Sequence, residues 1–182
     1  MEKEVYYPKF YDIIYRSGYI TGFVGIVLFV FSYVFLNIYG FYAGIIIFYA
    51  GTLISSLFVL VWKKEIKIFI LSCVILGIFF GLAYLFIYRN TEILIISMGL
   101  VLAGLAGLYG KEAHCFHFAE GWILMWSFPV LVFANLLIYG FNAENAYAVR
   151  TVFCIIYFII MLLAFSFLIK KIRQPLMQFC QG

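Results

Sequence analysis

Residues 68–88 read IFILSCVILGIFFGLAYLFIY, and this unbroken apolar stretch decides the fold. The hydrocarbon core of a bilayer is about 30 Å thick, so a helix that rises about 1.5 Å per residue needs roughly 20 apolar residues to cross it. Similar stretches fill most of the chain, and together they predict six spans: 18–36, 43–61, 68–88, 93–109, 122–139 and 147–169. The sequence therefore predicts an all-α, polytopic membrane protein whose single domain covers residues 1–182.

The composition supports this assignment and excludes a soluble domain. Hydrophobic residues make up 67% of the chain and charged residues 11%, whereas soluble domains average about 45–50% and 25%. Backbone groups in lipid must be satisfied within a helix or a closed barrel. Barrel strands alternate apolar and polar residues, but residues 23–35 and 155–165 are apolar on every side. We therefore expect helices.

The basic residues predict how the chain is oriented. Because cytoplasmic loops are enriched in lysine and arginine, we expect both termini in the cytosol. The cytosolic parts would be residues 1–16, the main loop 110–121 and the tail 170–182. Anionic lipid accounts for the net charge of +4 without a nucleic acid partner. Ten of the twelve basic residues fall on this side: Lys3, Lys9, Arg16, Lys63, Lys64, Lys67, Lys111, Lys170, Lys171 and Arg173.

Small residues recur at helical spacing on three spans and predict where helices touch. Residues 18–36 carry Gly18, Gly22 and Gly25, and residues 68–88 carry Gly77 and Gly81. A third line follows Gly99, Ala103 and Gly107 in residues 93–109. Close backbone approach supplies the packing that lipid does not favour otherwise. These stripes predict that the first, third and fourth spans lie near the centre of the bundle, or that they form a seam between two copies.

Charged groups are absent from the middle of every predicted span. Carriers driven by ions or protons bury such groups on their pathway, so coupled transport is disfavoured, and we expect no cofactor. Milder polar groups remain at Thr52, Ser55, Ser56 and Asn135, and Pro129 predicts a kink in its helix. A kink of this kind could open a cavity for an uncharged solute.

The loop 110–121 contains side chains that bind metals. His114, Cys115 and His117 are weak candidate ligands, flanked by Glu112 and Glu120. The specific zinc spacings are missing, however, and solvated histidines explain the loop as well. Cys115 and Cys180 fall on the predicted cytosolic side, where thiols stay reduced. No catalytic pattern is present, so enzyme activity has no positive support.

Three segments resemble a known family. They are Ile14-Tyr15-Arg16-Ser17-Gly18, the run from Gly107 to Phe116 with its Lys-Glu-x-x-Cys-Phe pattern, and Arg173-Gln174-Pro175. In order and spacing the chain is similar to bacterial integral membrane proteins known only as domain of unknown function 2301. It ends sooner after Pro175 than that family does, and His114 and His117 are not characteristic of it. The resemblance implies a six-helix fold in the inner (plasma) membrane of a bacterium, but no activity.

The same segments predict a shared site at the cytosolic end, made of Arg16, Lys111, Glu112, Cys115, Phe116 and Gln174. It could dock a protein partner, an anionic lipid head group or a small anion, or it could clamp the helix ends together. We therefore expect a non-catalytic accessory subunit or assembly scaffold that contacts the lipid bilayer and other membrane subunits or a second copy. The alternatives are a carrier or channel for an uncharged or lipophilic solute, and a metal- or thiol-dependent membrane enzyme centred on Cys115.

Overall fold

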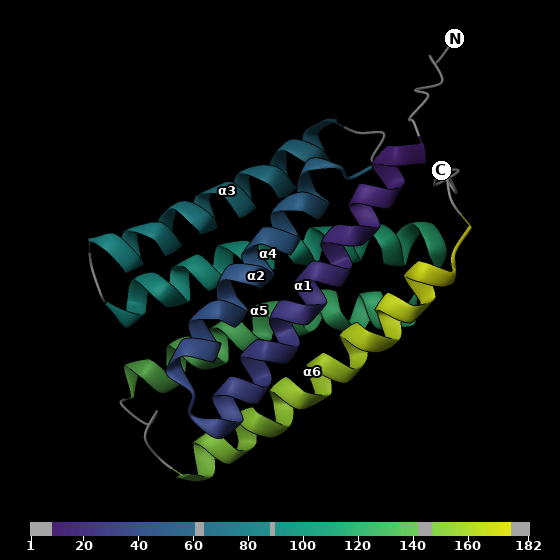
Figure 1. Ribbon diagram of the computed structural model, residues 1–182. Coiled ribbons are helices and arrows are strands. Elements are labelled where there is room, and N and C mark those ends of the chain that lie inside the picture. The colour runs from purple at the N-terminus through teal and green to yellow at the C-terminus, as the bar shows by residue number, and fades with distance from the viewer. Residues whose placement is uncertain (1–8, 61–63, 88–89, 142–146, 176–182) are drawn as a thin grey trace.

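The computed structural model describes residues 9–60, 64–87, 90–141 and 147–175, and Figure 1 shows their arrangement. Every one of the helices found there is long and apolar enough to cross a bilayer. The predicted all-α membrane fold is therefore confirmed. The helices are α1 (Lys9–Phe35), α2 (Ile38–Leu57), α3 (Lys64–Phe86), α4 (Thr91–Phe116), α5 (Ala119–Gly140) and α6 (Tyr147–Arg173).

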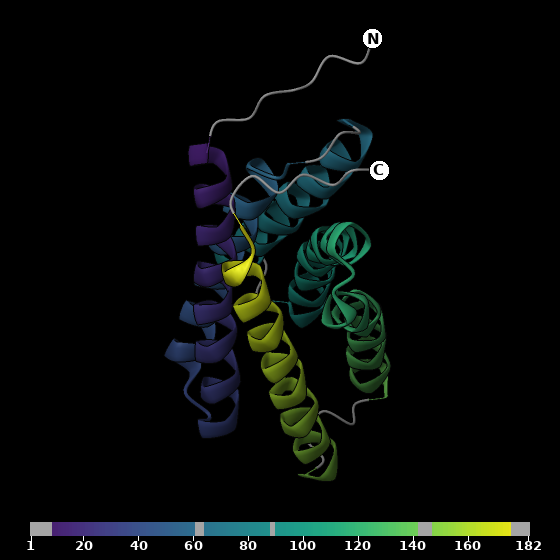
Figure 2. The ribbon, with the colours of Figure 1, turned by 90° about the vertical axis from the view of Figure 1, so that its right-hand side faces the viewer.

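The helices form a bundle in which α1 and α2 make the most extensive contact. In addition, α3 packs on α4, and α4 packs on α5. Figure 2 shows α6 between the α1–α2 pair and the α4–α5 pair, and α6 contacts both α1 and α5. The beginning of α1 and the end of α6 lie at the same end of the bundle, where Arg16 hydrogen-bonds to the carbonyl of Pro175.

Glycines explain why α1 and α2 approach so closely. A Cβ atom added at Gly25 would collide with the backbone nitrogen of Phe48, and one added at Gly51 would collide with that of Gly22. The predicted glycine stripe of residues 68–88 also forms a contact, because a Cβ at Gly77 would meet Val101 of α4. These stripes therefore mark contact faces, as expected.

The predicted centre of the bundle is wrong in one respect. α3 lies at the edge: among the described residues it packs mainly on α4 and to a lesser extent on α2, and few of its residues are buried. α2 has twice as many buried residues and contacts α1, α3 and α4. The glycine stripe on α3 contacts mainly α4. The buried residues of α2, in contrast, include glycines on one face and Tyr49 and Ser56 on others.

Helices extend further than predicted at the charged end of the bundle. The expected loop 110–121 is mostly helical, because α4 continues to Phe116 and α5 begins at Ala119. α1 likewise begins at Lys9, within the expected segment 1–16, and α6 extends to Arg173, within the expected tail 170–182. Charged residues had set the predicted limits of the spans, but inside the bundle those residues find partners and the helices continue.

Candidate functional site

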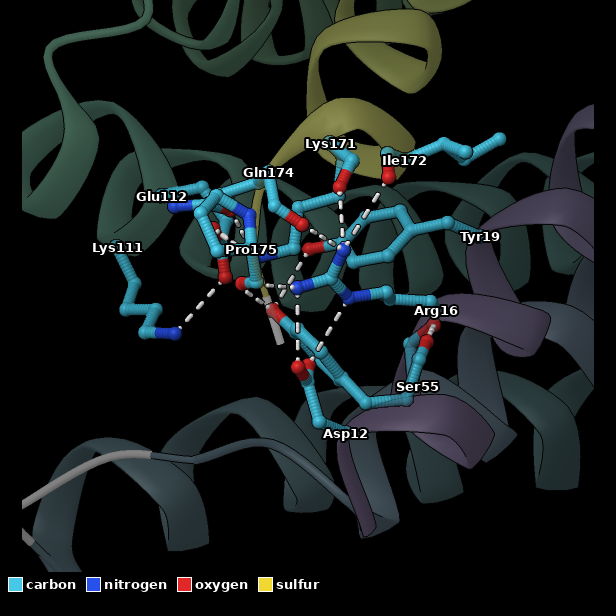
Figure 3. A network of polar contacts seen from close by, with 11 residues as sticks. Asp12, Arg16, Tyr19, Ser55, Lys111, Glu112, Lys171, Ile172, Gln174 and Pro175 are labelled. Atoms are coloured by element: carbon cyan, nitrogen blue, oxygen red, sulfur yellow. Dashed lines mark hydrogen bonds and ion pairs between the residues drawn. The ribbon is translucent and has the colours of Figure 1, made fainter. Parts of the chain in front are cut away.

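A buried cluster of charged side chains joins α1, α4 and α6 at the end of the bundle where α1 begins (Figure 3). Glu112 of α4 lies at its centre and has no exposed surface. Its Oε1 accepts a hydrogen bond from the Tyr15 hydroxyl (2.7 Å) and one from Lys111 Nζ (2.8 Å). Its Oε2 accepts from Lys171 Nζ at 2.6 Å. A carboxylate withdrawn from water requires such charged and hydrogen-bonded partners.

Arg16 connects the same end of α1 to the end of α6. Its Nε and Nη2 donate to the two carboxylate oxygens of Asp12, one helical turn earlier, at 3.2 and 3.0 Å. Its Nη1 donates to the carbonyl oxygens of Lys171 (2.9 Å) and Gln174 (2.6 Å), and its Nη2 donates to that of Pro175 (2.9 Å). The last carbonyls of a helix lack partners within the helix and carry partial negative charge. Arg16 therefore caps α6.

Aromatic rings cover the two lysines. The ammonium groups of Lys111 and Lys171 lie 5.4 and 5.3 Å from the ring centre of Tyr15. Both also face the ring of Phe116, at 5.8 and 4.9 Å. Cations are attracted to the faces of aromatic rings, more strongly where water is excluded. The rings therefore stabilise both ammonium groups where the hydration shell has been stripped.

We call this group the charged cluster: Asp12, Tyr15, Arg16, Lys111, Glu112, Phe116, Lys171 and Gln174. Five of the six predicted site residues belong to it, all except Cys115. Sequence reasoning missed three members. Asp12 and Arg16 are recognisable in the sequence as an (i, i+4) pair on a helix. Lys171 enters the sequence argument only as one of the basic residues that predict the orientation in the membrane. Nothing in the local pattern marks Tyr15 as a partner of Glu112.

The cysteine and histidines of the predicted loop are placed differently. Cys115 is disulfide-bonded in this structure, so it offers no free thiol as a metal ligand or nucleophile there; Cys180 lies outside the described residues. His114 and His117 are exposed. Among the described residues, no three histidine, cysteine or carboxylate side chains are grouped so that they could hold a metal ion.

A cavity of about 430 Å³ occupies the other half of the bundle. Side chains of α1, α2, α4, α5 and α6 line it, and none of these described residues is charged. Most are aliphatic or aromatic, such as Phe29, Leu102 and Phe153. The polar exceptions include Asn135 and Tyr157, whose hydroxyl donates to Asn135 Oδ1 across a long 3.4 Å contact. The cavity is therefore largely apolar, with a few polar side chains among the residues that line it.

The cavity differs in position from the one proposed at the sequence level. Of the residues named there, only Asn135 lines it. The hydroxyl of Thr52 donates to the carbonyl of Phe48, and that of Ser55 donates to the carbonyl of Tyr15. Pro129 lies inside α5, which continues through it. The hydroxyls of α2 are thus engaged in helix contacts.

A layer of aromatic side chains separates the cavity from the charged cluster. The rings of Tyr19 and Tyr109 lie 5.8 Å apart, and Phe167 lies 4.5 Å from Tyr109. Phe128 contacts Tyr109 from the cavity side, at 5.8 Å. All four side chains are buried. The charged cluster and the cavity are therefore two distinct features at different depths.

Comparisons of the chain with protein-family models, with curated proteins and with solved structures find no match. The similarity to domain of unknown function 2301 stays a prediction. The functional argument therefore depends on the cavity and on the charged cluster.

The two features differ in the chemistry that they can support. In the charged cluster each carboxylate is already paired with a basic side chain of the same protein, and such contacts can hold helices together. The cavity has room for a molecule, and its walls offer dispersion contacts with few hydrogen bonds. Its uncharged lining favours a neutral guest, because a buried charge without a partner is very costly.

Proposed function

We propose that this protein binds an uncharged, lipophilic small molecule within the bilayer and acts as a carrier for it. The cavity is the observation that supports this proposal. Its volume of about 430 Å³ falls within the range of small-molecule sites, roughly 300–1,000 Å³. Such sites combine apolar walls with a few polar groups that orient the ligand, a role that Asn135 and Tyr157 would have here.

The surroundings of the cavity favour a carrier over an open channel. The aromatic layer of Tyr19, Tyr109, Phe128 and Phe167 blocks the way from the cavity toward the charged cluster. Beyond it, the Lys171–Glu112 ion pair joins α6 to α4, and hydrogen bonds from Tyr15 and Arg16 join α1 to both helices. A molecule in the cavity could reach that end only if these contacts rearranged. Transport would therefore require a change of conformation.

Filling the cavity tests the proposal. Val132 lines the cavity, so Val132→Trp should occupy part of it. Val130 is 68% exposed two residues earlier on the same helix, and Val130→Trp adds the same side chain outside. We expect neutral lipophilic molecules to be extracted in near-stoichiometric amount from the purified protein and from Val130→Trp, and to be depleted from Val132→Trp. Equal recovery from all three would contradict the proposal.

The setting that we propose is a bacterial plasma membrane, with the charged cluster facing the cytosol. The asymmetry of lysine and arginine supports this orientation. The accessory-subunit hypothesis gains less from the structure, because Glu112, Lys171 and Arg16 are buried and engaged within the chain. This burial favours the clamp over a docking surface for another protein.

A further inference from the structure

The charged cluster carries more positive than negative charge. Arg16 is matched by Asp12 and by the carbonyl groups at the end of α6. Glu112, in contrast, is the only carboxylate that faces both Lys111 and Lys171 among the described residues. The remaining carboxylate nearby, Glu120, pairs with Lys170 instead. Among the residues that the structure describes, one positive charge is therefore left over, on side chains that are at most 11% exposed.

Hydrogen-bond donors are also left over at this place. Among the described residues, Lys111 Nζ makes one hydrogen bond, although an ammonium group carries three donors. Gln174 accepts from Lys171 through its Oε1, but its Nε2 is buried and has no partner in the described part of the chain. A buried donor without an acceptor costs free energy. The surplus of charge and the surplus of donors both call for an anion with several acceptor oxygens.

The depth of the cluster points to the kind of anion. Glu112 lies one turn before the end of α4 at Phe116, and Lys171 lies two residues before the end of α6 at Arg173. The ends of membrane-spanning helices lie at the level of the lipid head groups. Lysines at this level attract anionic lipid.

We propose that Lys111, Lys171 and Gln174 form a binding site for a phosphate-type oxyanion. Its charge balances the extra lysine, and its oxygens accept from the ammonium groups and from Gln174 Nε2. Lys111 is the more exposed of the two lysines, with 11% of its side chain accessible, so the anion enters on that side. The phosphate of an anionic phospholipid and free inorganic phosphate share this chemistry. The site is independent of the cavity and of its proposed ligand.

The first test uses the unmodified chain in a nonionic detergent. Its melting temperature is measured with added phosphatidylglycerol, phosphatidylcholine, or sodium phosphate against sodium chloride at matched ionic strength. A rise with phosphatidylglycerol alone identifies a lipid, and a rise with phosphate over chloride identifies the free anion. No preference for phosphatidylglycerol over phosphatidylcholine, together with none for phosphate over chloride, overturns the proposal.

The second test removes the extra charge. Lys111→Met leaves Lys171 and Glu112 as a balanced pair, so we expect this variant to fold. Lys64→Met is the matched control, because Lys64 is an exposed lysine on the same predicted side, outside the cluster. Native mass spectrometry should show that Lys111→Met weakens binding of the preferred probe about tenfold, the loss of one charge-assisted hydrogen bond. Lys64→Met should leave binding unchanged.

Equal effects of the two substitutions would show that the probe is attracted to the basic surface in general. That result would overturn the assignment of a specific anion site. If Lys111→Met does not fold, Lys111→Arg keeps the charge and the donors. The proposal then requires that Lys111→Arg retains the preference of the unmodified chain. Loss of that preference in a folded Lys111→Arg protein, with Lys64→Met unaffected, would overturn the assignment of Lys111 to an anion site.

Discussion

At the scale of single residues, Glu112 should be among the least replaceable side chains. Glu112→Gln would leave Lys111 and Lys171 facing each other without a carboxylate between them. Removing one partner of a buried ion pair costs about 3–5 kcal/mol. We expect a loss of that size in the free energy of unfolding, measured by titration with sodium dodecyl sulfate in mixed micelles.

The control for this substitution is Glu120→Gln. Glu120 also pairs with a lysine, but Lys170 is 46% exposed. Exposed pairs contribute about 1 kcal/mol or less. A loss as large for Glu120→Gln as for Glu112→Gln would show that burial is not the cause.

Arg16 gives a second prediction at this scale. Its planar group donates to Asp12 and, in other directions, to the carbonyls of Lys171 and Pro175. Lysine keeps the charge but cannot reproduce these directions. We expect Arg16→Lys to lower the free energy of unfolding by about 1.5–3 kcal/mol, the range for a lost hydrogen bond to a charged group. Hydrogen exchange should also rise at the last turn of α6, and protection equal to that of the unmodified chain would contradict the capping role.

At the scale of the helices, the contact between α1 and α2 can be tested with two glycines one turn apart. A Cβ at Gly25 would collide with the backbone of Phe48, whereas one at Gly22 meets nothing closer than 3.9 Å. Gly25→Ala should therefore destabilise the bundle by about 1–3 kcal/mol, as overpacking does. Gly22→Ala should be neutral or slightly stabilising, because alanine favours a helix by up to about 1 kcal/mol over glycine. Unfolding in mixed micelles compares the two, and equal effects would contradict this geometry.

The helix ends show where sequence reasoning about elements fails. The spans followed from length and apolarity, which backbone hydrogen bonding in lipid makes decisive. The local pattern at Lys111 and Glu112, however, predicts the start of a loop. They remain helical because Tyr15 and Lys171, which are distant in sequence, supply partners for Glu112. A local pattern carries no information on such partners.

At the scale of the whole molecule, topology predicted much of the charged cluster. Successive helices cross the membrane in opposite directions, so the start of the first span and the ends of the fourth and sixth lie on the same side. This topology predicts that Arg16, Lys111 and Gln174 lie at one end of the bundle. The cavity could not be predicted in the same way. It arises from the spacing of five helices, and Asn135 was the one lining residue that its polarity singled out. Apolar side chains such as Leu102 look alike in sequence whether they face lipid, a neighbour or a void.

The orientation of the bundle is the last prediction, and it decides from which side each feature is reached. Lys64 is exposed at the beginning of α3, on the side predicted to be cytosolic, and Tyr39 is 85% exposed near the beginning of α2, on the opposite side. In intact cells, a membrane-impermeant maleimide should label Tyr39→Cys, and it should label Lys64→Cys only after the membrane is permeabilised. The unmodified chain measures the background from its own cysteines. The reverse pattern would mean that the rule for positive charges fails here, and the charged cluster would then face away from the cytosol.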